Sequence, residues 1–347
     1  MASKAIKLKK LNEQVIVLTG ATSGIGLATA RMAAEAGARL VLVAREADAL
    51  DALAHEMRQR GVEVATVAAD VGVQDEVAKI GRTAVERFGR VDTWINNAGI
   101  GTFGTLEEVK LEDMQRLMQT NLWGVVNGSL EAVKLFKAHG GGALINVGSE
   151  ASDRSIPLQG TYAASKHAVR AFTESLRMEL EKDKAPISVT LIKPAAIATP
   201  FPMHAKNYME NEPTLPSPLY APELAARTIL HAAEVPERDL FVGGQAKLAS
   251  VLSQILPRTI DRFMRAAVFK QQQTDQPSSP ARRDALHAPD ARRELRQRAD
   301  LGKKITETSP YTSFQMQSTA TKTVLLGGAL LAAWALTRKP ARRVWHA

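Results

Sequence analysis

Short apolar runs alternate with amphipathic stretches over the first 195 residues of the chain. Runs rich in Val, Ile, Leu and Ala lie at residues 15–18, 40–43, 62–69, 93–96, 143–147 and 188–192. The stretches between them, such as 27–36 and 47–60, have the pattern of amphipathic helices. Strands that are apolar on both faces and separated by helices indicate a parallel sheet covered on each side. We therefore expect an α/β fold with a doubly wound, mostly parallel sheet of the Rossmann type.

The pattern changes after residue 200. Residues 201–222 contain five prolines and several apolar side chains that look exposed. These are Met203, Tyr208, Met209 and Leu219. A segment of this length and composition predicts a lid over an apolar substrate. A further helix is expected at 223–233.

Composition divides the chain into four parts. Residues 1–245 form a single expected domain, and residues 246–270 form an amphipathic helical extension broken at Pro257. Residues 271–317 are rich in Gln, Pro, Ser and Arg and predict a flexible basic linker. Residues 318–347 are first apolar and then basic.

The bulk composition narrows the class of protein. With 347 residues, 45% of them hydrophobic and 23% charged, the chain has the composition of a soluble globular protein. The absence of cysteine excludes disulfides, thiolate metal sites and a cysteine nucleophile. The seven histidines lack metal-ligand spacing, so no metal site is expected. Residues 1–10 are basic and contain no apolar signal sequence, so we expect a cytoplasmic protein.

The net charge of +9 is concentrated near the C-terminus. From Arg258 to Ala347 there are 17 Lys or Arg against 7 Asp or Glu, whereas the residues before Arg258 are close to neutral. This asymmetry predicts either a tail that meets an anionic surface or a solvated basic linker. Nucleic acid is not the expected partner, because no base-reading fold or interleaved aromatic residues accompany the basic ones. Within the main domain, Glu112 and Asp113 look like solvated helix charges.

The tail carries an apolar stretch of 13 residues, Val324–Leu336, followed by the basic cluster Arg338–Arg343. As a helix this stretch would span roughly 20 Å, short of the roughly 30 Å of a hydrocarbon core. The tail is compatible with an interfacial helix, a marginal membrane anchor, or a helix that packs on the protein or on a partner. The sequence alone leaves these alternatives for residues 318–347 open.

The first apolar run leads into a glycine turn and then a helix. The residues placed to approach a phosphate there are Gly20, Thr22, Ser23, Gly24, Ile25 and Gly26. Glycines permit a tight turn and close backbone approach, and a helix N-terminus offers N–H groups and a positive dipole to an anion. Strand, turn and helix in this order predict a dinucleotide-binding site.

The end of the second apolar run indicates the cofactor preference. A fold specific for NAD usually places an acidic residue there to hold the ribose 2′-hydroxyl, but this chain has Ala44 and Arg45. A guanidinium can bind a 2′-phosphate, so NADP(H) is favoured over NAD(H). Alternatively, Glu46 contacts a hydroxyl and Arg45 is solvated.

Tyr162 and Lys166 are a candidate acid–base pair. Residues four apart share one face of a helix, and a neighbouring ammonium would lower the pKa of the phenol from its ordinary value of about 10. The pair alone is weak evidence, because such contacts are common on helix surfaces. Ser149, thirteen residues before Tyr162, could bind a substrate oxygen. It has no paired His and carboxylate at a recognisable motif, which argues against a serine hydrolase.

Further motifs lie between these sites, at Asp70-Val71, Asn96-Asn97-Ala98-Gly99 and Asn121. With the glycine turn, Ser149, Tyr162 and Lys166, they resemble the classical branch of the short-chain dehydrogenase/reductase family over about residues 12–245. The resemblance implies cofactor contacts by Asp70, Val71, Asn97, Ala98, Gly99, Tyr162, Lys166, Pro194, Ile197 and Thr199. The family commonly has Pro-Gly where this chain has Pro194-Ala195.

The resemblance also implies a catalytic set of Asn121, Ser149, Tyr162 and Lys166. In this set Tyr162 is the acid or base, Lys166 also binds the nicotinamide ribose, and Asn121 positions a water that leads to the lysine. The resemblance further implies a homo-oligomer formed through the helices that hold Asn121 and Tyr162.

The sequence therefore predicts a single catalytic domain with a helical and flexible C-terminal tail. Its expected function is that of an NADP(H)-dependent oxidoreductase, which transfers a hydride between nicotinamide and a carbonyl or secondary alcohol of a small, apolar substrate. The alternative is an NADP(H)-binding scaffold or membrane-associated adaptor whose tail carries the function. The complete set of four catalytic residue types argues against that alternative.

Overall fold

The computed structural model describes residues 6–279, 281–289, 295–318 and 320–324 of the chain. Its centre is a seven-stranded sheet in the spatial order β3-β2-β1-β4-β6-β7-β11, in which all neighbouring strands are parallel. The strands are β1 (Val15–Thr19), β2 (Arg39–Ala44), β3 (Val64–Ala68), β4 (Thr93–Asn96), β6 (Gly142–Val147), β7 (Ile187–Pro194) and β11 (Asp239–Val242). The doubly wound α/β fold of the Rossmann type is thus confirmed.

Six of these strands lie where the apolar runs predicted them, and β11 was not predicted. It is an edge strand of four residues that pairs only with β7 in the sheet. The charged residues Glu237, Arg238 and Asp239 lie before and at its start. A strand this short, with charges at its beginning, leaves too brief an apolar run to be detected.

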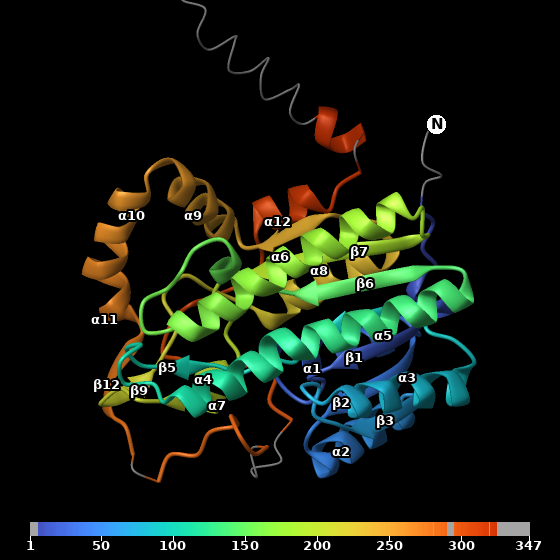
Figure 1. Ribbon diagram of the computed structural model, residues 1–347, viewed down its shortest axis with the longest axis horizontal. Helices are drawn as coiled ribbons and strands as arrows, with labels where there is room; N and C mark the ends of the chain where they lie inside the picture. The colour runs from blue at the N-terminus through green and yellow to red at the C-terminus, as the bar shows by residue number, and fades with distance from the viewer. Residues whose placement is uncertain (1–5, 280, 290–294, 319, 325–347) are drawn as a thin grey trace, which may run out of the picture.

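Helices cover both faces of the sheet (Figure 1). One face is covered by α1 (Gly24–Glu35), α2 (Ala47–Gln59) and α8 (Pro222–Glu234), and the other by α3 (Gln74–Phe88), α5 (Gly124–His139) and α6 (Gly160–Lys182). In β1, Ile16 and Leu18 pack toward α1 and α8, whereas Val15 and Val17 pack toward α3 and α5. All four side chains are at most 1% exposed. Burying each such side chain stabilises the folded protein by about 1.5–3 kcal/mol. The side chains on both faces of β1 therefore hold the helical layers against the sheet.

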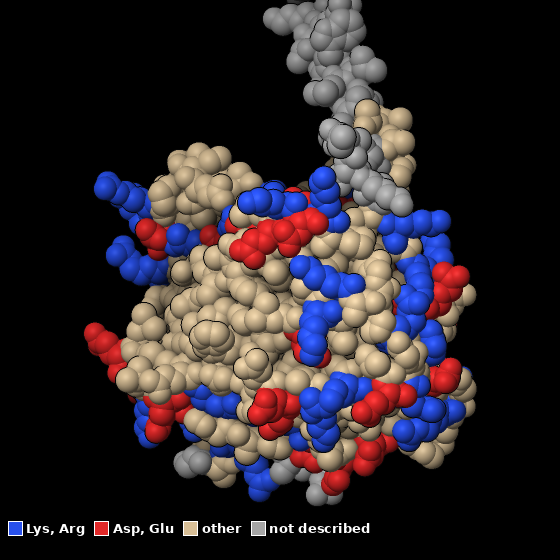
Figure 2. Space-filling model, turned by 45° about the vertical axis from the view of Figure 1, so that its right-hand side comes forward, with Lys and Arg blue, Asp and Glu red and all other residues tan. Residues whose placement is uncertain are grey.

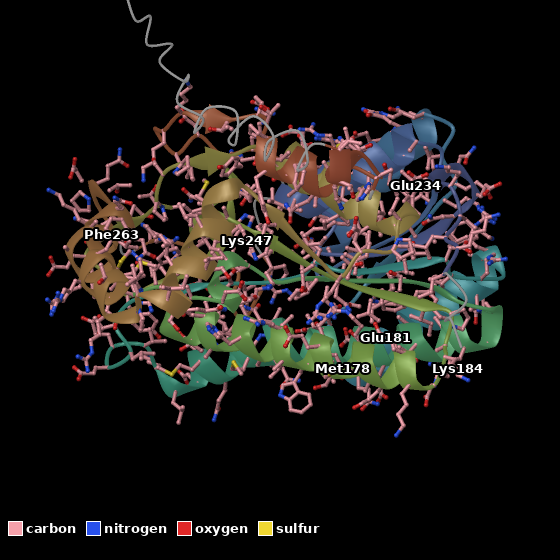
Figure 3. All side chains as sticks on the ribbon, turned by 90° about the horizontal axis from the view of Figure 1, so that it is seen from above. Met178, Glu181, Lys184, Glu234, Lys247 and Phe263 are labelled. Carbon is pink, nitrogen blue, oxygen red and sulfur yellow. The ribbon has the colours of Figure 1, made fainter. Side chains whose placement is uncertain are left out.

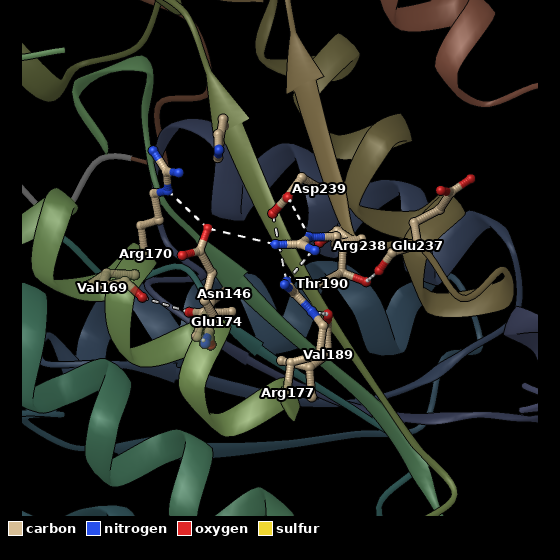
Figure 4. A network of polar contacts seen from close by, with 12 residues as sticks. Asn146, Val169, Arg170, Glu174, Arg177, Val189, Thr190, Glu237, Arg238 and Asp239 are labelled. Carbon is tan, nitrogen blue, oxygen red and sulfur yellow. Dashed lines mark hydrogen bonds and ion pairs between the residues drawn. The ribbon is translucent and has the colours of Figure 1, made fainter. Parts of the chain in front are cut away.

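Arg177 holds helix α6 against the edge of the sheet. Its guanidinium donates to the carbonyl oxygens of Val189 on β7 at 2.8 Å and of Arg238 at 2.9 Å. It also lies 3.6 Å from the carboxylate of Asp239 on β11 (Figure 4). Arg177 is only 7% exposed, so these bonds form away from water. They fix the second half of the helix whose first turns carry the candidate acid–base pair.

The segment 201–222, expected to be a lid, is folded onto neighbouring parts of the chain. It contains helix α7 (Phe201–His204) and strands β8 (Lys206–Asn207), β9 (Asn211–Pro213) and β10 (Leu219–Tyr220). These strands pair respectively with β5 (Thr102–Phe103), β12 (Gln273–Pro277) and β13 (Ile305–Thr306). Leu219, expected to be exposed, is fully buried in a small cluster with Phe103 and Leu215. Strands of two or three residues are too short to produce a detectable alternation of polar and apolar positions.

Helices follow β11 in the extension predicted at 246–270. They are α9 (Gly244–Ile255), α10 (Pro257–Phe263), the π-helical turn Met264–Val268 and α11 (Phe269–Gln271). The break expected at Pro257 lies between α9 and α10. Figure 3 shows Phe263 at the outer edge of this extension. Leu248, Ile255 and Phe263 are each more than half exposed, so the extension presents apolar side chains to its surroundings.

Residues 271–317, expected to be a flexible linker, pack on the domain over much of their described length. This part supplies β12, β13 and helix α12 (Pro310–Gln315). Ala285, Leu286 and Ala299 are at most 8% exposed. The composition of these residues did not predict the packing. Many of their contacts are made by backbone groups and arginine side chains, which a flexible linker also contains. The described residues 281–289 and 295–300 are called the strap below.

The end of the chain lies largely outside the described residues. Of the segment expected at 318–347, only residues 318 and 320–324 are described. Within the described part of the chain, no helix has the length and apolar character needed to cross a membrane. Figure 2 shows Lys and Arg side chains interspersed with Asp and Glu on the visible face. This mixture agrees with the nearly neutral balance of the residues before Arg258.

Candidate active site

A cleft lies at the carboxyl ends of the sheet strands, where open parallel sheets bind ligands. It consists of two adjoining cavities that share Gly20, Ser23 and Ala98 as walls. The predicted site residues that line it are Gly20, Thr22, Ser23, Gly24, Ile25, Gly26, Arg45, Asp70, Val71, Asn97, Ala98, Gly99, Ser149, Tyr162, Lys166, Pro194, Ile197 and Thr199. Asn121, the remaining predicted residue, does not line either cavity.

The glycine turn fits a ligand that approaches the backbone closely. Gly20 and Gly24 have φ angles of +67° and +54°, which residues with a side chain rarely adopt. A Cβ atom at Gly26 would overlap the carbonyl oxygen of Gly20, so the turn requires glycine there. Helix α1 begins at Gly24, immediately after the turn. By its shape and by the helix N-terminus behind it, the turn fits the phosphates of a dinucleotide.

Asn97 fastens the end of β4 to the glycine turn. Its side-chain amide donates to the carbonyl oxygens of Thr19 at 3.0 Å and Gly20 at 3.2 Å. The Thr19 hydroxyl accepts from the backbone N–H groups of Asn97 at 3.0 Å and Ala98 at 3.1 Å. Two walls of the cleft are therefore bonded directly to each other.

Arg45, at the end of β2, reaches the strap. Its guanidinium donates to the carbonyl oxygen of Leu286 at 3.2 Å and also to that of Ala285. Arg116, on helix α4 (Leu111–Met118), donates to the same Leu286 oxygen at 3.1 Å and pairs with Asp70 at 2.5 Å. Two guanidinium groups and one carboxylate thus meet at this end of the cleft. No sequence motif marks Arg116, and it was not predicted.

Ser149, Tyr162 and Lys166 come together in the second cavity. Ser149 caps the 3-10 turn Glu150–Ser152 with its hydroxyl. Lys166 is 4% exposed and donates to the carbonyl oxygen of Val147 at 2.9 Å. Its ammonium lies 5.7 Å from the centre of the Tyr162 ring. The sequence expectation that both side chains lie on one face of a helix is therefore confirmed.

Burial dominates the acidity of Tyr162. It raises the pKa of the phenol to about 12, while a hydrogen bond with Ser149 lowers that pKa and the carboxyl of Glu150 raises it. Burial also lowers the pKa of Lys166 to about 8. The sequence predicted that Lys166 lowers the pKa of Tyr162. For the groups of the protein alone that prediction is wrong, because the pKa is raised. A desolvated phenolate is unfavourable, and the ammonium is directed to a backbone carbonyl instead.

Glu150 is a residue of the cleft that the sequence did not reveal. It lines the second cavity beside Ser149, and burial raises the pKa of its carboxyl to about 7. In the sequence, a glutamate after a strand-end serine resembles an ordinary turn residue. What makes it unusual is its raised pKa, which depends on the surrounding fold.

Asn121 lies behind the wall of the cleft, in the π-helical turn Gln119–Trp123 that joins α4 to α5. Its side chain is fully buried and exchanges two hydrogen bonds with the backbone of Ile100, each 2.9 Å long. A third bond, 3.2 Å long, goes to the hydroxyl of Ser165. The side chain therefore fixes the backbone that follows Gly99. Because the side chain is already bonded, any water that Asn121 positions would have to bind its backbone carbonyl. π-Helical turns occur frequently at functional sites.

The loop after β7 closes the cleft opposite the glycine turn. Thr199 lies 3.1 Å from the point where a Cβ atom of Gly24 would stand, so the loop and the turn are in contact. The backbone N–H of Ala195 donates to the carbonyl oxygen of Val242 at 2.9 Å. Alanine in place of the family's glycine therefore keeps the end of β7 bonded to β11.

Apolar side chains surround the space beside Tyr162. The ring of Phe201 lies 5.3 Å from the Tyr162 ring, and Ile156, Leu215 and Pro216 line the same cavity. His167, which follows Lys166 in the chain, bonds through Nδ1 to the carbonyl oxygen of Ala163 within its own helix at 2.9 Å. Among the described residues, no group of three or more His, Asp or Glu side chains could hold a metal ion.

Comparison with known proteins identifies similar chains. Residues 14–210 match the family described as short chain dehydrogenase. The uncharacterized oxidoreductase YxnA of Bacillus subtilis (strain 168) is 45% identical over 336 residues, which cover 96% of this chain and 93% of that protein. The putative oxidoreductase SadH of Mycobacterium tuberculosis (strain ATCC 25618 / H37Rv) is 33% identical over 264 residues, which cover 74% of this chain and 96% of that protein.

Two solved structures are similar to this chain in fold and in sequence. An alcohol dehydrogenase from the archaeon Thermococcus sibiricus, complexed with 5-hydroxy-NADP, has a TM-score of 0.57 and 31% identity, covering 66% of this chain and 95% of that one. A short chain dehydrogenase/reductase from Burkholderia phymatum, in complex with NAD, has a TM-score of 0.64 and 25% identity, covering 77% of this chain and 98% of that one.

Proposed function

Because the chain belongs to the short-chain dehydrogenase/reductase family, we propose that it is an NADP(H)-dependent oxidoreductase acting on a carbonyl or secondary alcohol. The observation that carries the proposal is that Ser149, Tyr162 and Lys166 line the same cleft as the glycine turn. A group that can move a proton thus adjoins a site whose shape suits a dinucleotide. The bound cofactor supplies the hydride, and the chain supplies position and proton transfer.

Tyr162 donates the proton to the substrate oxygen in reduction. Its pKa of about 12 keeps the phenol protonated at neutral pH, which is the form that reduction requires. Ser149 holds the same substrate oxygen with its hydroxyl and orients it toward Tyr162. In the reverse direction the phenol takes the proton as phenolate, a form that burial disfavours.

The chain's own residues would hold the cofactor along the cleft. The turn from Gly20 to Gly26 takes the phosphates, and Asp70 and Val71 flank the adenine end. The loop from Pro194 to Thr199, together with Lys166, takes the nicotinamide end. The two solved relatives were complexed with different dinucleotides, so the preference for NADP(H) rests on Arg45 of this chain.

The substrate is a small, apolar carbonyl compound or alcohol. Support comes from the side chains of Ile156, Phe201, Leu215 and Pro216 around the catalytic tyrosine. Apolar walls with a few convergent polar groups are the usual composition of small-molecule sites.

The assembly is a homo-oligomer formed through α5 and α6. Trp123 and Leu130, at the start of and within α5, are 51% and 52% exposed, and Met178 on α6 is 62% exposed. Figure 3 shows Met178 on the outer side of α6. Large apolar side chains on adjoining helices favour contact with another protein surface. Replacing Met178 and Leu130 with Lys should convert the oligomer to a monomer in size-exclusion chromatography with light scattering.

For the tail, residues 318–347, we propose contact with an anionic membrane surface. The apolar stretch and the basic cluster after it support this, as do the exposed Leu248, Ile255 and Phe263 of the helical extension. Cell fractionation of the full chain and of a chain ending at residue 317 tests it. Equal distribution of the two proteins between membrane and cytoplasm would refute it.

The catalytic proposal is tested with purified protein, NADPH or NADH, and a panel of ketones, aldehydes, steroids and quinones. We expect turnover with NADPH on apolar members of the panel. Tyr162→Phe should lower kcat by a factor of about 100 or more while the protein still binds NADPH. Full turnover by Tyr162→Phe on any substrate found would exclude Tyr162 as the proton donor.

A further inference from the structure

The strap bonds to the protein groups that the proposed function assigns to the cofactor. Arg45, the proposed 2′-phosphate ligand, donates to the carbonyl oxygens of Ala285 and Leu286. At the other end, the backbone N–H of Gly24 donates to the carbonyl oxygen of Arg296 at 3.0 Å. Ala285 and Arg296 also line the first cavity. One segment thus engages both the arginine and the phosphate turn.

Several contacts anchor the strap beside Arg45. The side chain of Leu286 is fully buried in a cluster with Ile100 and Leu117. The backbone N–H of Ala285 donates to the carbonyl oxygen of His204 on α7 at 2.8 Å. These contacts position the two carbonyl oxygens that Arg45 binds.

His287 adds a bond between its Nε2 atom and the carboxylate of Asp113, 2.5 Å long. Asp113 is only 4% exposed and also accepts a hydrogen bond from the Tyr208 hydroxyl at 2.5 Å. The sequence interpretation of Asp113 as a solvated helix charge is therefore wrong. Its carboxylate joins α4 to both the strap and the segment 201–222.

A 2′-phosphate would form stronger bonds with Arg45 than the carbonyl oxygens of the strap do. A carbonyl oxygen carries only a partial negative charge, whereas a phosphate offers charge-assisted, bidentate bonds to a guanidinium. Arg116 donates to the same Leu286 oxygen. A 2′-phosphate at this point would therefore be close to a second positively charged group. A ribose 2′-hydroxyl, which has no charge, cannot replace the strap in this way.

We propose that residues 284–287 of the strap set the cofactor preference by competing with the 2′-phosphate for Arg45. The inference rests on the proposed function and adds a specificity element from outside the region matched by the family. NADP(H) displaces Ala285 and Leu286 from Arg45, whereas NAD(H) leaves them in place. Because the strap holds Arg45 in the remaining molecules, the apparent affinity for NADP(H) is the intrinsic affinity multiplied by the fraction of molecules in which Arg45 is released.

The test measures the Kd values of NADPH and NADH by fluorescence, using the full chain. His287→Ala removes the bond to Asp113 at a side chain that is 56% exposed, so the protein should fold normally. Leu286→Ala removes the buried anchor and serves as an independent second variant. We expect both variants to bind NADPH more tightly, by about fivefold or more, and to bind NADH with nearly unchanged affinity. His55→Ala, an exposed histidine on α2, is the matched control.

Combination with Arg45→Met identifies the group for which the strap competes. In that background the gain for NADPH should disappear, because no guanidinium remains to be released. Equal changes for NADPH and NADH, weaker binding in the strap variants, or an unchanged gain in the Arg45→Met background would each overturn the inference. In these three cases the proposed function stands, since the dinucleotides still bind. If the unmodified protein binds neither dinucleotide, the proposed function fails and the inference fails with it.

Hydrogen exchange gives a readout independent of affinity. The backbone N–H of Ala285 is bonded to His204 in the strap-bound arrangement. Saturating NADP⁺ should accelerate its exchange relative to saturating NAD⁺. Equal protection with both dinucleotides would contradict displacement of the strap.

Discussion

The ammonium of Lys166 lies 5.7 Å from the centre of the Tyr162 ring and donates to the carbonyl oxygen of Val147 at 2.9 Å. The two residues therefore adjoin on α6, but the lysine is bonded to the end of β6. Burial of the phenol raises its pKa to about 12, and the neighbouring ammonium, which is bonded to the Val147 carbonyl oxygen, does not offset that rise. In the protein alone, the lysine acts as a fixed charge between the sheet and the tyrosine.

Lys166→Met should lower kcat by a factor of about 100 or more, because it removes a group that lies beside the proton donor and that the proposed function assigns to the nicotinamide end of the cofactor. Single-turnover kinetics at saturating NADPH measure this separately from cofactor binding. Lys182→Met, at the exposed end of the same helix, is the control and should keep full activity. Half or more of the original kcat in Lys166→Met would show that the ammonium is dispensable.

Glu150→Gln should remove part of the pH dependence of stability. Burial raises the pKa of Glu150 from 4.5 to about 7, so the folded state holds this proton more tightly than the unfolded chain does. The contribution to stability is fully present below about pH 4.5 and is lost as the pH rises through 7, by about 3 kcal/mol at most. Urea unfolding should find the variant more stable than the original protein at pH 8 and close to it at pH 4.5.

The control for that experiment is Glu35→Gln, whose side chain is 64% exposed. It should leave the pH dependence unchanged. If Glu150→Gln follows the same curve as the original protein from pH 4.5 to pH 8, the carboxyl is solvated and its proposed burial is wrong.

Gly26→Ala should abolish binding of both dinucleotides. A methyl group there would overlap the carbonyl oxygen of Gly20, and the turn would have to open. Titration with NADPH, followed by fluorescence, measures the loss. Gly61→Ala is the control, because no atom lies within 4 Å of its added Cβ atom. It should cost about 1–2 kcal/mol of stability from its left-handed backbone and leave binding intact.

Arg177→Met should lower the free energy of unfolding by about 2–4 kcal/mol. It removes one hydrogen-bond donor from each of the carbonyl oxygens of Val189 and Arg238 and one cationic neighbour from the Asp239 carboxylate. Urea denaturation measures the change. Arg238→Met, at a side chain that is 68% exposed, should cost less than about 1 kcal/mol. Equal losses in the two variants would show that the contacts of Arg177 contribute no more than a surface pair.

The parts of the site that the sequence predicted have local signatures. The glycine turn depends on a backbone shape that few other residues can adopt, and Tyr162 and Lys166 depend on the spacing of one helical turn. Each of these patterns spans only a few residues, so it can be recognised in the sequence without knowledge of the fold. The central strands were predictable for the same reason, because both of their faces are apolar.

The parts that were missed depend on contacts between distant residues. Arg45 and Leu286 are 241 residues apart, and His287 and Asp113 are 174 apart. No periodicity connects such pairs, and the composition of the strap is that of a linker. The raised pKa of Glu150 was equally hidden, since it depends on the removal of water by the surrounding fold.

The position of the strap in the chain also affects the order of events during synthesis. All seven strands of the sheet have been translated once Val242 is complete, but the carbonyl oxygen that bonds to Gly24 belongs to Arg296. At about 5–20 residues per second, the ribosome needs several more seconds to deliver that residue. During this interval the nascent domain has Arg45 without the strap, so we expect NADP(H) to reach Arg45 more readily before residues 284–287 have packed on the domain than afterwards.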